Sequence, residues 1–245
     1  MLYPGAAAAS DAAAAPARQR TSRPIVTGTS VLGVKYKDGV MLAADTLASY
    51  GSLAMFKDVT RVSKTGSYTL VGASGEMSDY HAILDKLRAL EQGNANLNDG
   101  FEHGPKEIYS YLRAVMYQRR NKFDPLWNSL VVGGFKDGAP FLGCVDLRGT
   151  AYEDDMIATG YGSHLALPVM RAKWTPDLDE GEARALLEDC LRVLFYRDCR
   201  ALDTVVLSKA TAAGTLVSEP YKLETDWTSA SFVEPKAGQD GDGGW

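Results

Sequence analysis

The chain has 245 residues, of which 45% are hydrophobic and 23% charged, and a net charge of −5. This globular composition suffices for one sizeable core, and the lack of a lysine- and arginine-rich block excludes a nucleic-acid partner. Three cysteines without Cys-x-x-Cys spacing suggest neither a disulfide framework nor a zinc site, and no apolar run reaches the about 20 residues of a membrane span. We expect a soluble protein of the cytoplasm and nucleus, with no cofactor, metal or membrane contact.

The first segment of the chain, residues 1–20, is dominated by alanine and ends among Arg18, Arg20 and Arg23. Such a biased segment cannot form a packed core on its own. We predict a disposable leader. A mitochondrial transit peptide is the alternative, because such peptides contain arginine and few acidic residues, but Asp11 and the short length argue against it.

The first half of the remaining chain is predicted to form a β-hairpin, one further strand and two helices. An Asp-Gly turn signal at residues 37–39 separates two β-rich runs. Apolar residues at spacings of three and four indicate a helix that Ser74-Gly75 opens, and Gly104-Pro105 introduces a second one. The predicted strands cover residues 30–36, 40–45 and 68–73.

The second half repeats this order of strands followed by helices. A turn at residues 136–139 separates two more strands, and two helices and two closing strands follow. Because the strands come as hairpins, antiparallel sheets are favoured over parallel βαβ units, and the simplest α+β fold places two sheets between two helical layers. The strands are predicted at 126–135, 140–147, 204–210 and 215–217, and the helices at 163–174 and 180–196.

Several of these segments resemble proteasome beta subunits. The Gly28-Thr29 junction precedes an apolar strand, and a second apolar run ends in Ala44-Asp45 at the spacing typical of that family. The likeness continues at residues 72–75 and 159–162, each ahead of a helix, and at residues 196–198, where the fourth helix ends. Within the family, the chain looks closest to the non-catalytic subunit at the seventh beta position of the eukaryotic ring.

The resemblance covers the chain from Thr21 to Trp227 and implies a four-layer αββα sandwich of the N-terminal-nucleophile hydrolase fold. It also implies partners, namely the other alpha and beta subunits of the twenty-eight-subunit barrel of the 20S core particle, which serves ubiquitin-dependent protein degradation. We expect residues 1–20 to be a leader or propeptide, residues 21–225 to be the domain, and residues 226–245 to be a tail ordered on a partner.

The resemblance also assigns the positions of an active site. In active members, self-cleavage of the Gly-Thr bond frees a threonine whose own α-amino group takes the hydroxyl proton. That threonine corresponds to Thr29, the supporting aspartate to Asp45, and the oxyanion position to Gly75. The supporting lysine falls on Arg61, which stays protonated and cannot exchange a proton as a lysine can.

A serine-glycine pair follows the aspartate of the fourth helix in active members, whereas this chain reads Ala201-Leu202 after Asp198. A methyl group cannot hold the threonine amine, and leucine fills the space that glycine leaves open. The pocket has therefore lost a hydrogen-bonding group and room. We expect six vestigial positions: Thr29, Asp45, Arg61, Gly75, Asp198 and Ala201.

The leader adds a third argument, because the resemblance places the maturation point between Arg20 and Thr21. Thr29 would then keep an amide in place of a free amine and lack its general base. In the tail, Trp227 and Phe232 are expected to contact the opposite beta ring, since apolar groups on a weakly structured segment order on a partner.

The sequence thus predicts a non-catalytic structural beta subunit that forms part of the beta ring and supports half-particle joining. Two alternatives remain: an active threonine endopeptidase self-processed at Gly28-Thr29, and a free-standing amidohydrolase of the same fold. His81, His103 and His164 have no acidic or cysteine partner at metal-ligand spacing and are expected to be surface or packing residues.

Overall fold

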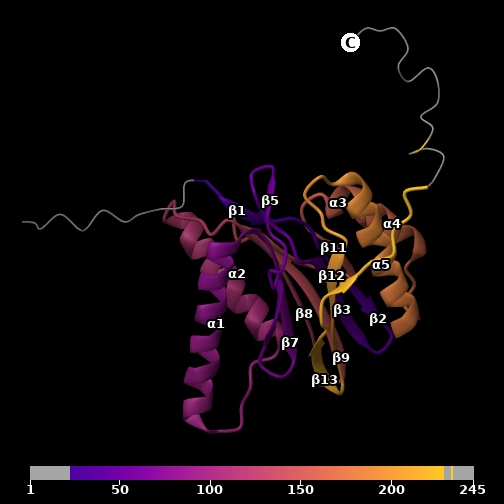
Figure 1. The fold of residues 1–245 in the computed structure, drawn as a ribbon. Coiled ribbons are helices and arrows are strands. Elements are labelled where there is room, and N and C mark those ends of the chain that lie inside the picture. Colours follow the sequence, from indigo (N-terminus) through magenta and orange to yellow (C-terminus); the bar gives the residue numbers. More distant parts are fainter. Residues whose placement is uncertain (1–22, 229–232, 234–245) are drawn as a thin grey trace, which may run out of the picture.

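Two antiparallel sheets form the centre of the molecule (Figure 1). The computed structural model describes residues 23–228 and residue 233. The larger sheet has the order β10, β9, β8, β7, β1, β4, β5, with β6 also paired to β7. Its strands are β1 (Val26–Gly28), β4 (Ala48–Tyr50), β5 (Leu53–Phe56), β6 (Val62–Thr65), β7 (Thr69–Glu76), β8 (Asn128–Lys136), β9 (Ala139–Val145) and β10 (Ala151–Glu153).

The smaller sheet has the order β11, β2, β3, β12, β13, with β14 also paired to β12. Its centre is β3, which pairs with β2 on one side and with β12 on the other. Its strands are β2 (Val31–Tyr36), β3 (Gly39–Asp45), β11 (Met156–Ala158), β12 (Thr204–Thr211), β13 (Gly214–Val217) and β14 (Tyr221–Lys222).

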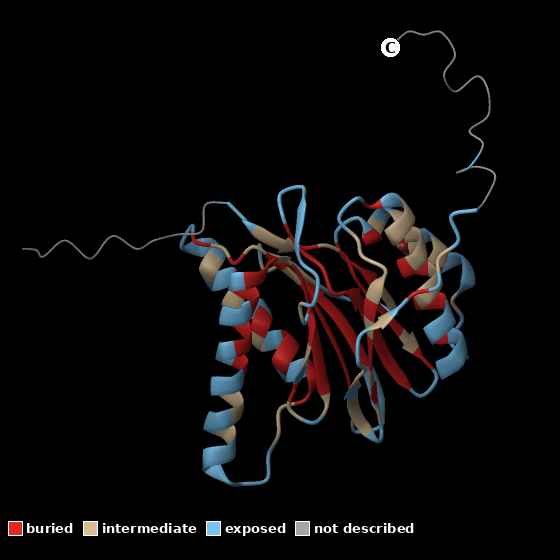
Figure 2. Cartoon of the chain, in the orientation of Figure 1, coloured by how far each residue is buried: buried red, intermediate tan, exposed pale blue. Residues whose placement is uncertain are grey.

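Helices cover the outer face of each sheet (Figure 1). Helices α1 (Met77–Leu97) and α2 (Pro105–Asn121) pack on the larger sheet, whereas α3 (Gly162–Leu165), α4 (Leu167–Lys173) and α5 (Glu180–Arg197) pack on the smaller one. A third apolar cluster fills the space between the sheets. Figure 2 shows buried residues on both sheets and on the inner faces of the helices. The fold is the predicted αββα sandwich.

The predicted element order is confirmed, and two differences exceed the shifts of one or two residues at the other element ends. Residues Ser74 and Gly75 do not open a helix: β7 continues through both of them to Glu76, and α1 begins at Met77. The predicted helix over residues 163–174 is divided into α3 and α4, because Pro168 has no N–H to donate to the preceding turn. Strands β1, β4, β5, β6, β10, β11 and β14 were not predicted.

Several predictions fall outside the described residues. These are the leader, the processing point at Arg20 and Thr21, and the tail residue Phe232. Among the described residues, no helix combines the length and apolar character needed to cross a bilayer.

Candidate active site around Thr29

Thr29 lies where the chain passes from one sheet to the other. The preceding strand, β1, belongs to the larger sheet, and β2, which starts two residues later, belongs to the smaller one. Ser30 fixes this crossing, because its Oγ accepts a 2.8 Å hydrogen bond from Gly162 N at the start of α3. The backbone of the crossing is thereby held between the two sheets.

The Thr29 hydroxyl is bound to the end of helix α5. Thr29 Oγ1 donates a 2.6 Å hydrogen bond to Asp198 Oδ2, and Arg200 N donates to the other carboxylate oxygen at 2.9 Å. Helix α5 starts in a reciprocal capping box between Asp179 and Glu182, whose backbone and side-chain groups bond each other at 2.8 and 3.0 Å. Its buried apolar stripe packs on the smaller sheet, which fixes where Asp198 ends the helix.

Arg61 and Asp45 form a buried ion pair beneath Thr29. Arg61 Nη1 donates to Asp45 Oδ1, and the two residues are 2% and 4% exposed. Arg61 Nη2 donates to the carbonyl oxygens of Thr29 at 2.5 Å and Ser30 at 2.8 Å. The guanidinium also fills the space beside Gly28, where a Cβ would approach Arg61 Nε to 2.5 Å. Arg61 therefore holds the backbone around Thr29, whereas the Thr29 hydroxyl is bound to Asp198.

The Asp45 carboxyl is an ionisable group in a nearly dry environment. Burial raises its pKa to about 6, and the Arg61 guanidinium and the Leu202 N–H oppose this shift. Leu202 N donates to Asp45 Oδ2 at 2.9 Å. At neutral pH the carboxylate is ionised and is satisfied by a guanidinium that stays protonated throughout the physiological range. The pair therefore binds backbone and cannot pass a proton to Thr29.

Gly75 occupies a position that only glycine can take. Its φ is +96°, and a Cβ there would lie 2.0 Å from the carbonyl oxygen of Trp127. Asn128 fixes the strand on both sides, since its Nδ2 donates to Ser74 O at 3.1 Å and to Glu76 O at 2.8 Å. The position predicted for the oxyanion hole thus lies in the strand next to β1, paired with Gly28.

Apolar side chains close the space next to Thr29 on the side of Ala201 and Leu202. The cavity between these residues, helix α5 and Asp45 has a volume of about 10 Å³. That is at or below the volume that a single water molecule needs. The Ala201 side chain is a methyl group without a hydrogen-bonding atom, and the loss of a catalytic group at this position stays a prediction.

On the opposite side, Thr29 faces an open cleft of about 230 Å³. Hydroxyl groups of Ser74 and Ser129 and the side chains of Tyr161 and Arg200 line it. The other five predicted positions therefore surround Thr29, but the described residues offer it no neutral amine or imidazole as a base.

The contacts of residues 25–28, which precede Thr29, were not predicted from the sequence. Strand β1 pairs with β4 through Val26 and Tyr50 and with β7 through Gly28 and Gly75. Glu76, at the end of β7, accepts hydrogen bonds from the N–H groups of Ile25 and Val26. The sequence offered one signal for this contact, namely the acidic residue Glu76 near the start of a predicted helix. Its partners, Ile25 and Val26, lie about 50 residues away in the sequence and could not be inferred.

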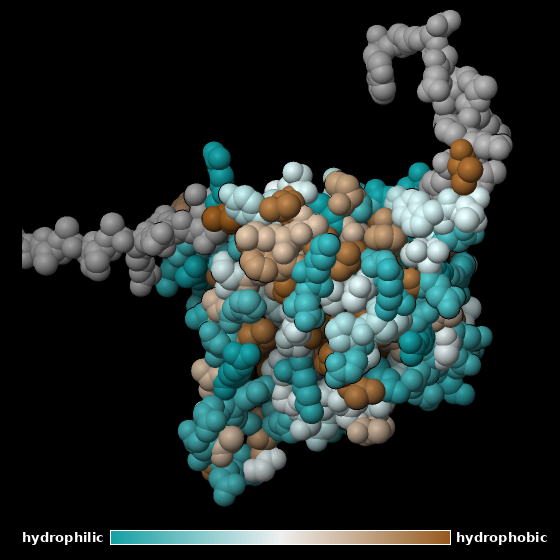
Figure 3. Space-filling view, in the orientation of Figure 1, coloured by the Kyte–Doolittle hydropathy of each residue, from teal (hydrophilic) through white to brown (hydrophobic). Residues whose placement is uncertain are grey.

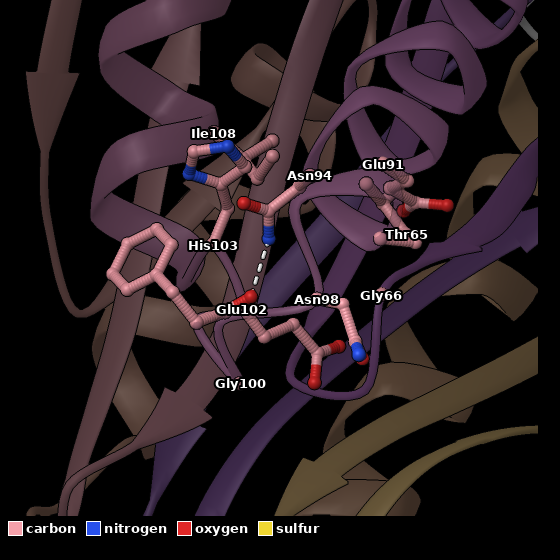
Figure 4. Close-up of a pocket in the computed structure, with 11 residues that line it drawn as sticks. Thr65, Gly66, Glu91, Asn94, Asn98, Gly100, Glu102, His103 and Ile108 are labelled. Atoms are coloured by element: carbon pink, nitrogen blue, oxygen red, sulfur yellow. Dashed lines mark hydrogen bonds between the residues drawn. The ribbon is translucent and has the colours of Figure 1, made fainter.

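A second hollow lies between the end of α1, the α1–α2 loop and the turn before β7 (Figure 4). Its volume is about 450 Å³, and its lining shares no residue with the Thr29 cleft. Asn94 binds the carbonyl oxygen of Phe101, and the Glu102 carboxylate accepts from Ser67 N, while His103 packs edge-on against Phe101. Among the described residues, no group of three or more His, Cys, Asp or Glu side chains could hold a metal ion.

Trp227 packs against its own chain. Its ring meets those of Phe195 and Tyr196 edge-on, at centroid distances of 5.8 and 4.9 Å, and Asp226 N donates to the Tyr196 hydroxyl at 2.7 Å. The start of the tail is thus fixed on the end of α5. About half of the Trp227 surface remains exposed, and its contact with an opposite ring stays a prediction.

Comparison with known proteins relates this site to one family. A family model described as "Proteasome subunit" matches residues 25–209. The proteasome subunit beta type-4 of Arabidopsis thaliana is 49% identical over 223 residues, covering 91% of each chain. The beta type-4 subunit of Dictyostelium discoideum is 48% identical, covering 86% of this chain and 83% of that protein, and that of Xenopus laevis is 44% identical, covering 88% and 90%.

Proposed function

This chain belongs to the proteasome subunit family, as a eukaryotic beta subunit close to beta type-4, and from this premise we propose that it has no catalytic activity of its own. It would occupy one place in a beta ring of the 20S core particle, help to wall the chamber and support the joining of half-particles. Its place of action would be the cytoplasm and nucleus.

The observation that carries this proposal is the environment of the Thr29 nitrogen. In the described chain this nitrogen is an amide that follows β1, a strand paired on both sides. An amide nitrogen has no basic lone pair to accept the hydroxyl proton, so the one-residue nucleophile and base cannot form as long as this paired strand stays attached. Self-cleavage at Gly28-Thr29 would also remove the strand that joins β4 to β7.

The surroundings of Thr29 support the same proposal. Its hydroxyl donates to Asp198, while Arg61 is committed to Asp45 and to two backbone carbonyl oxygens. Ala201 has no polar side-chain group, and the cavity beside it and Leu202 has a volume of only about 10 Å³. Arg61 therefore cannot accept the threonine proton, and Ala201 offers no polar group in place of the serine hydroxyl.

Covalent labelling tests the proposal. Purified particles containing the full chain are treated with a peptide electrophile that reacts with amino-terminal threonines, and each subunit is then analysed by mass spectrometry. We expect adducts on other beta subunits, which serve as the internal positive control, and none on Thr29. An adduct on Thr29 would instead support the threonine endopeptidase.

A further inference from the structure

The edge of the larger sheet at the β4–β5 hairpin exposes large apolar side chains. Ile25, Tyr50, Leu53, Met55 and Phe56 are 58, 54, 59, 51 and 46% exposed. Figure 3 shows brown and tan surface over β1 and this hairpin, near the top of the view. Such a contiguous apolar patch on a folded protein marks an interaction site, whereas singly scattered apolar residues would not.

Strand register places three of these side chains on one face. Tyr50 lies directly opposite Val26 in β1 and Leu53 in β5, and directly opposite residues of antiparallel strands point to the same side of a sheet. Phe56 lies opposite Ala48, which is buried in the core under α1. The hairpin face of Tyr50, Leu53 and Phe56 therefore continues the core-facing side of the sheet beyond the helices.

The backbone of β5 is also open. This strand ends the order of the larger sheet, so among the described residues one row of its N–H and C=O groups has no strand partner. Soluble proteins usually protect such edges with charged side chains or proline. The four residues of β5, Leu53-Ala54-Met55-Phe56, include neither, although the strand is short and carries a bulge at Met55.

We propose that the hairpin face of Tyr50, Leu53 and Phe56 is a docking surface for an adjoining subunit of the proteasome particle, which presents an uncharged apolar surface to it. The inference rests on the proposed function in taking its partner from the particle. Family membership supplies that partner, since proteasome subunits assemble with one another.

Charge distribution specifies the chemistry of the partner. The chain is acidic overall, with a net charge of −5, yet residues 50–56 include no charged side chain. In the sequence, Arg23 precedes the apolar residues of this face, and Lys57 and Asp58 follow them. A charge buried against the centre of the face would be left without a counter-ion, which is costly. Aromatic and methionine side chains are typical of the centres of such interfaces, with charges at the rim.

The double variant Leu53→Asp, Phe56→Asp tests the proposal in the assembled particle. A tagged full chain is expressed in cells with the other subunits, and its distribution between particles and free subunit is measured on native gels. We expect the incorporated fraction to fall at least about tenfold, the equivalent of 1.4 kcal/mol. Because both side chains are exposed, the thermal unfolding midpoint of the purified free chain should not change.

Leu216→Asp is the matched control. Leu216 is 57% exposed on β13, which lies at the opposite end of the molecule from β5 (Figure 1), and its variant should assemble like the parent chain. Normal incorporation of the double variant would overturn the proposal. If the unmodified tagged chain itself stayed out of particles, the proposed function would fail, whereas labelling of Thr29 would leave the docking result intact.

The free chain distinguishes other occupants of the face. A dimer that the double variant converts to monomer would assign the face to a second copy, and would overturn the proposal. Deletion of residues 1–20 addresses the chain's own leader. Increased binding of an apolar dye after this deletion, lost again in the double variant, would assign the face to the leader and equally overturn it.

Discussion

At the scale of single residues, Asp45 and Arg61 hold the site together. Both are almost fully buried, and Arg61 also binds the carbonyl oxygens of Thr29 and Ser30. In a site of this kind the arginine serves as a fixed scaffold, because its planar group donates several hydrogen bonds at once and does not lose its proton. Its charge and geometry are therefore suited to structure and unsuited to proton transfer.

Replacement of Arg61 by methionine should strongly destabilise the fold. The variant leaves the Asp45 carboxylate buried without its partner, which costs about 3–5 kcal/mol. Urea unfolding of the purified chain measures this loss. Adding Asp45→Asn should recover most of it, because no unpaired charge then remains. Arg88→Met, at an exposed pair with Asp85, is the control and should cost under about 1 kcal/mol.

The titration of Asp45 predicts a pH dependence of stability. Its folded-state pKa of about 6 lies above the ordinary value of 3.8, so the folded chain binds this proton more tightly than the unfolded chain. The favourable contribution is fully present below about 3.8 and is lost as pH rises through about 6. The free energy of unfolding, relative to that of Asp45→Asn, should therefore rise as pH falls; a constant difference between the two proteins would contradict this origin.

At the scale of elements, β1 is the strand on which the account depends. It has three residues, yet it joins the β4–β5 hairpin to β7 and brings Ile25 and Val26 to Glu76. Because β1 is paired with both β4 and β7, the folded chain is more stable with these residues than without them. The proposed retention of this segment and the proposed lack of catalysis would both follow from this one arrangement.

Removal of β1 should loosen the hairpin. A chain that starts at Thr29 lacks the partner of β4, so amide hydrogen exchange over residues 48–56 should accelerate at least about tenfold relative to a chain that starts at Arg23. Exchange in β2 and β3 is the internal control and should change little. Equal protection of the hairpin in the two chains would show that β1 contributes nothing to its stability.

The longer elements could be predicted from sequence because their patterns are regular. Helices α2 and α5 show apolar stripes and clear starts, and the β2–β3 and β8–β9 hairpins have Asp-Gly turns. Strands β1 and β5 could not be predicted, because three or four residues are too few to show the alternation of buried and exposed side chains. All four residues of β5 are exposed. The start of α1 was predicted too early, because Gly75 was taken as a residue that opens the helix. It lies instead within β7, with a positive φ.

The site was predictable only in part, and through resemblance. Asp45, Arg61 and Asp198 lie far apart in the sequence, and no spacing rule would bring them to Thr29. The substitutions at Ala201 and Leu202 could be read directly, and the closed cavity beside them is their structural result. The Thr29–Asp198 hydrogen bond and the contacts of Glu76 depend on long-range packing and could only come from the structure.

At the scale of the whole molecule, the tail offers a further test. Its start is fixed at the end of α5, where Trp227 packs on Phe195 and Tyr196. Deletion of residues 226–245 should leave the domain folded but slow the pairing of half-particles, measured by native gels over time. Deletion of residues 238–245 is the control. Unchanged kinetics after the longer deletion would exclude a role of the tail in joining.

We propose that Thr29 is never released as an N-terminus, and the first residue of the mature subunit decides this. The subunit is isolated from assembled particles, and its first residue is determined by N-terminal sequencing and intact mass. We predict a start upstream of Thr29, at Thr21, with β1 retained. A mature chain that starts at Thr29 would contradict the account, because the threonine would then carry the free amine that catalysis requires.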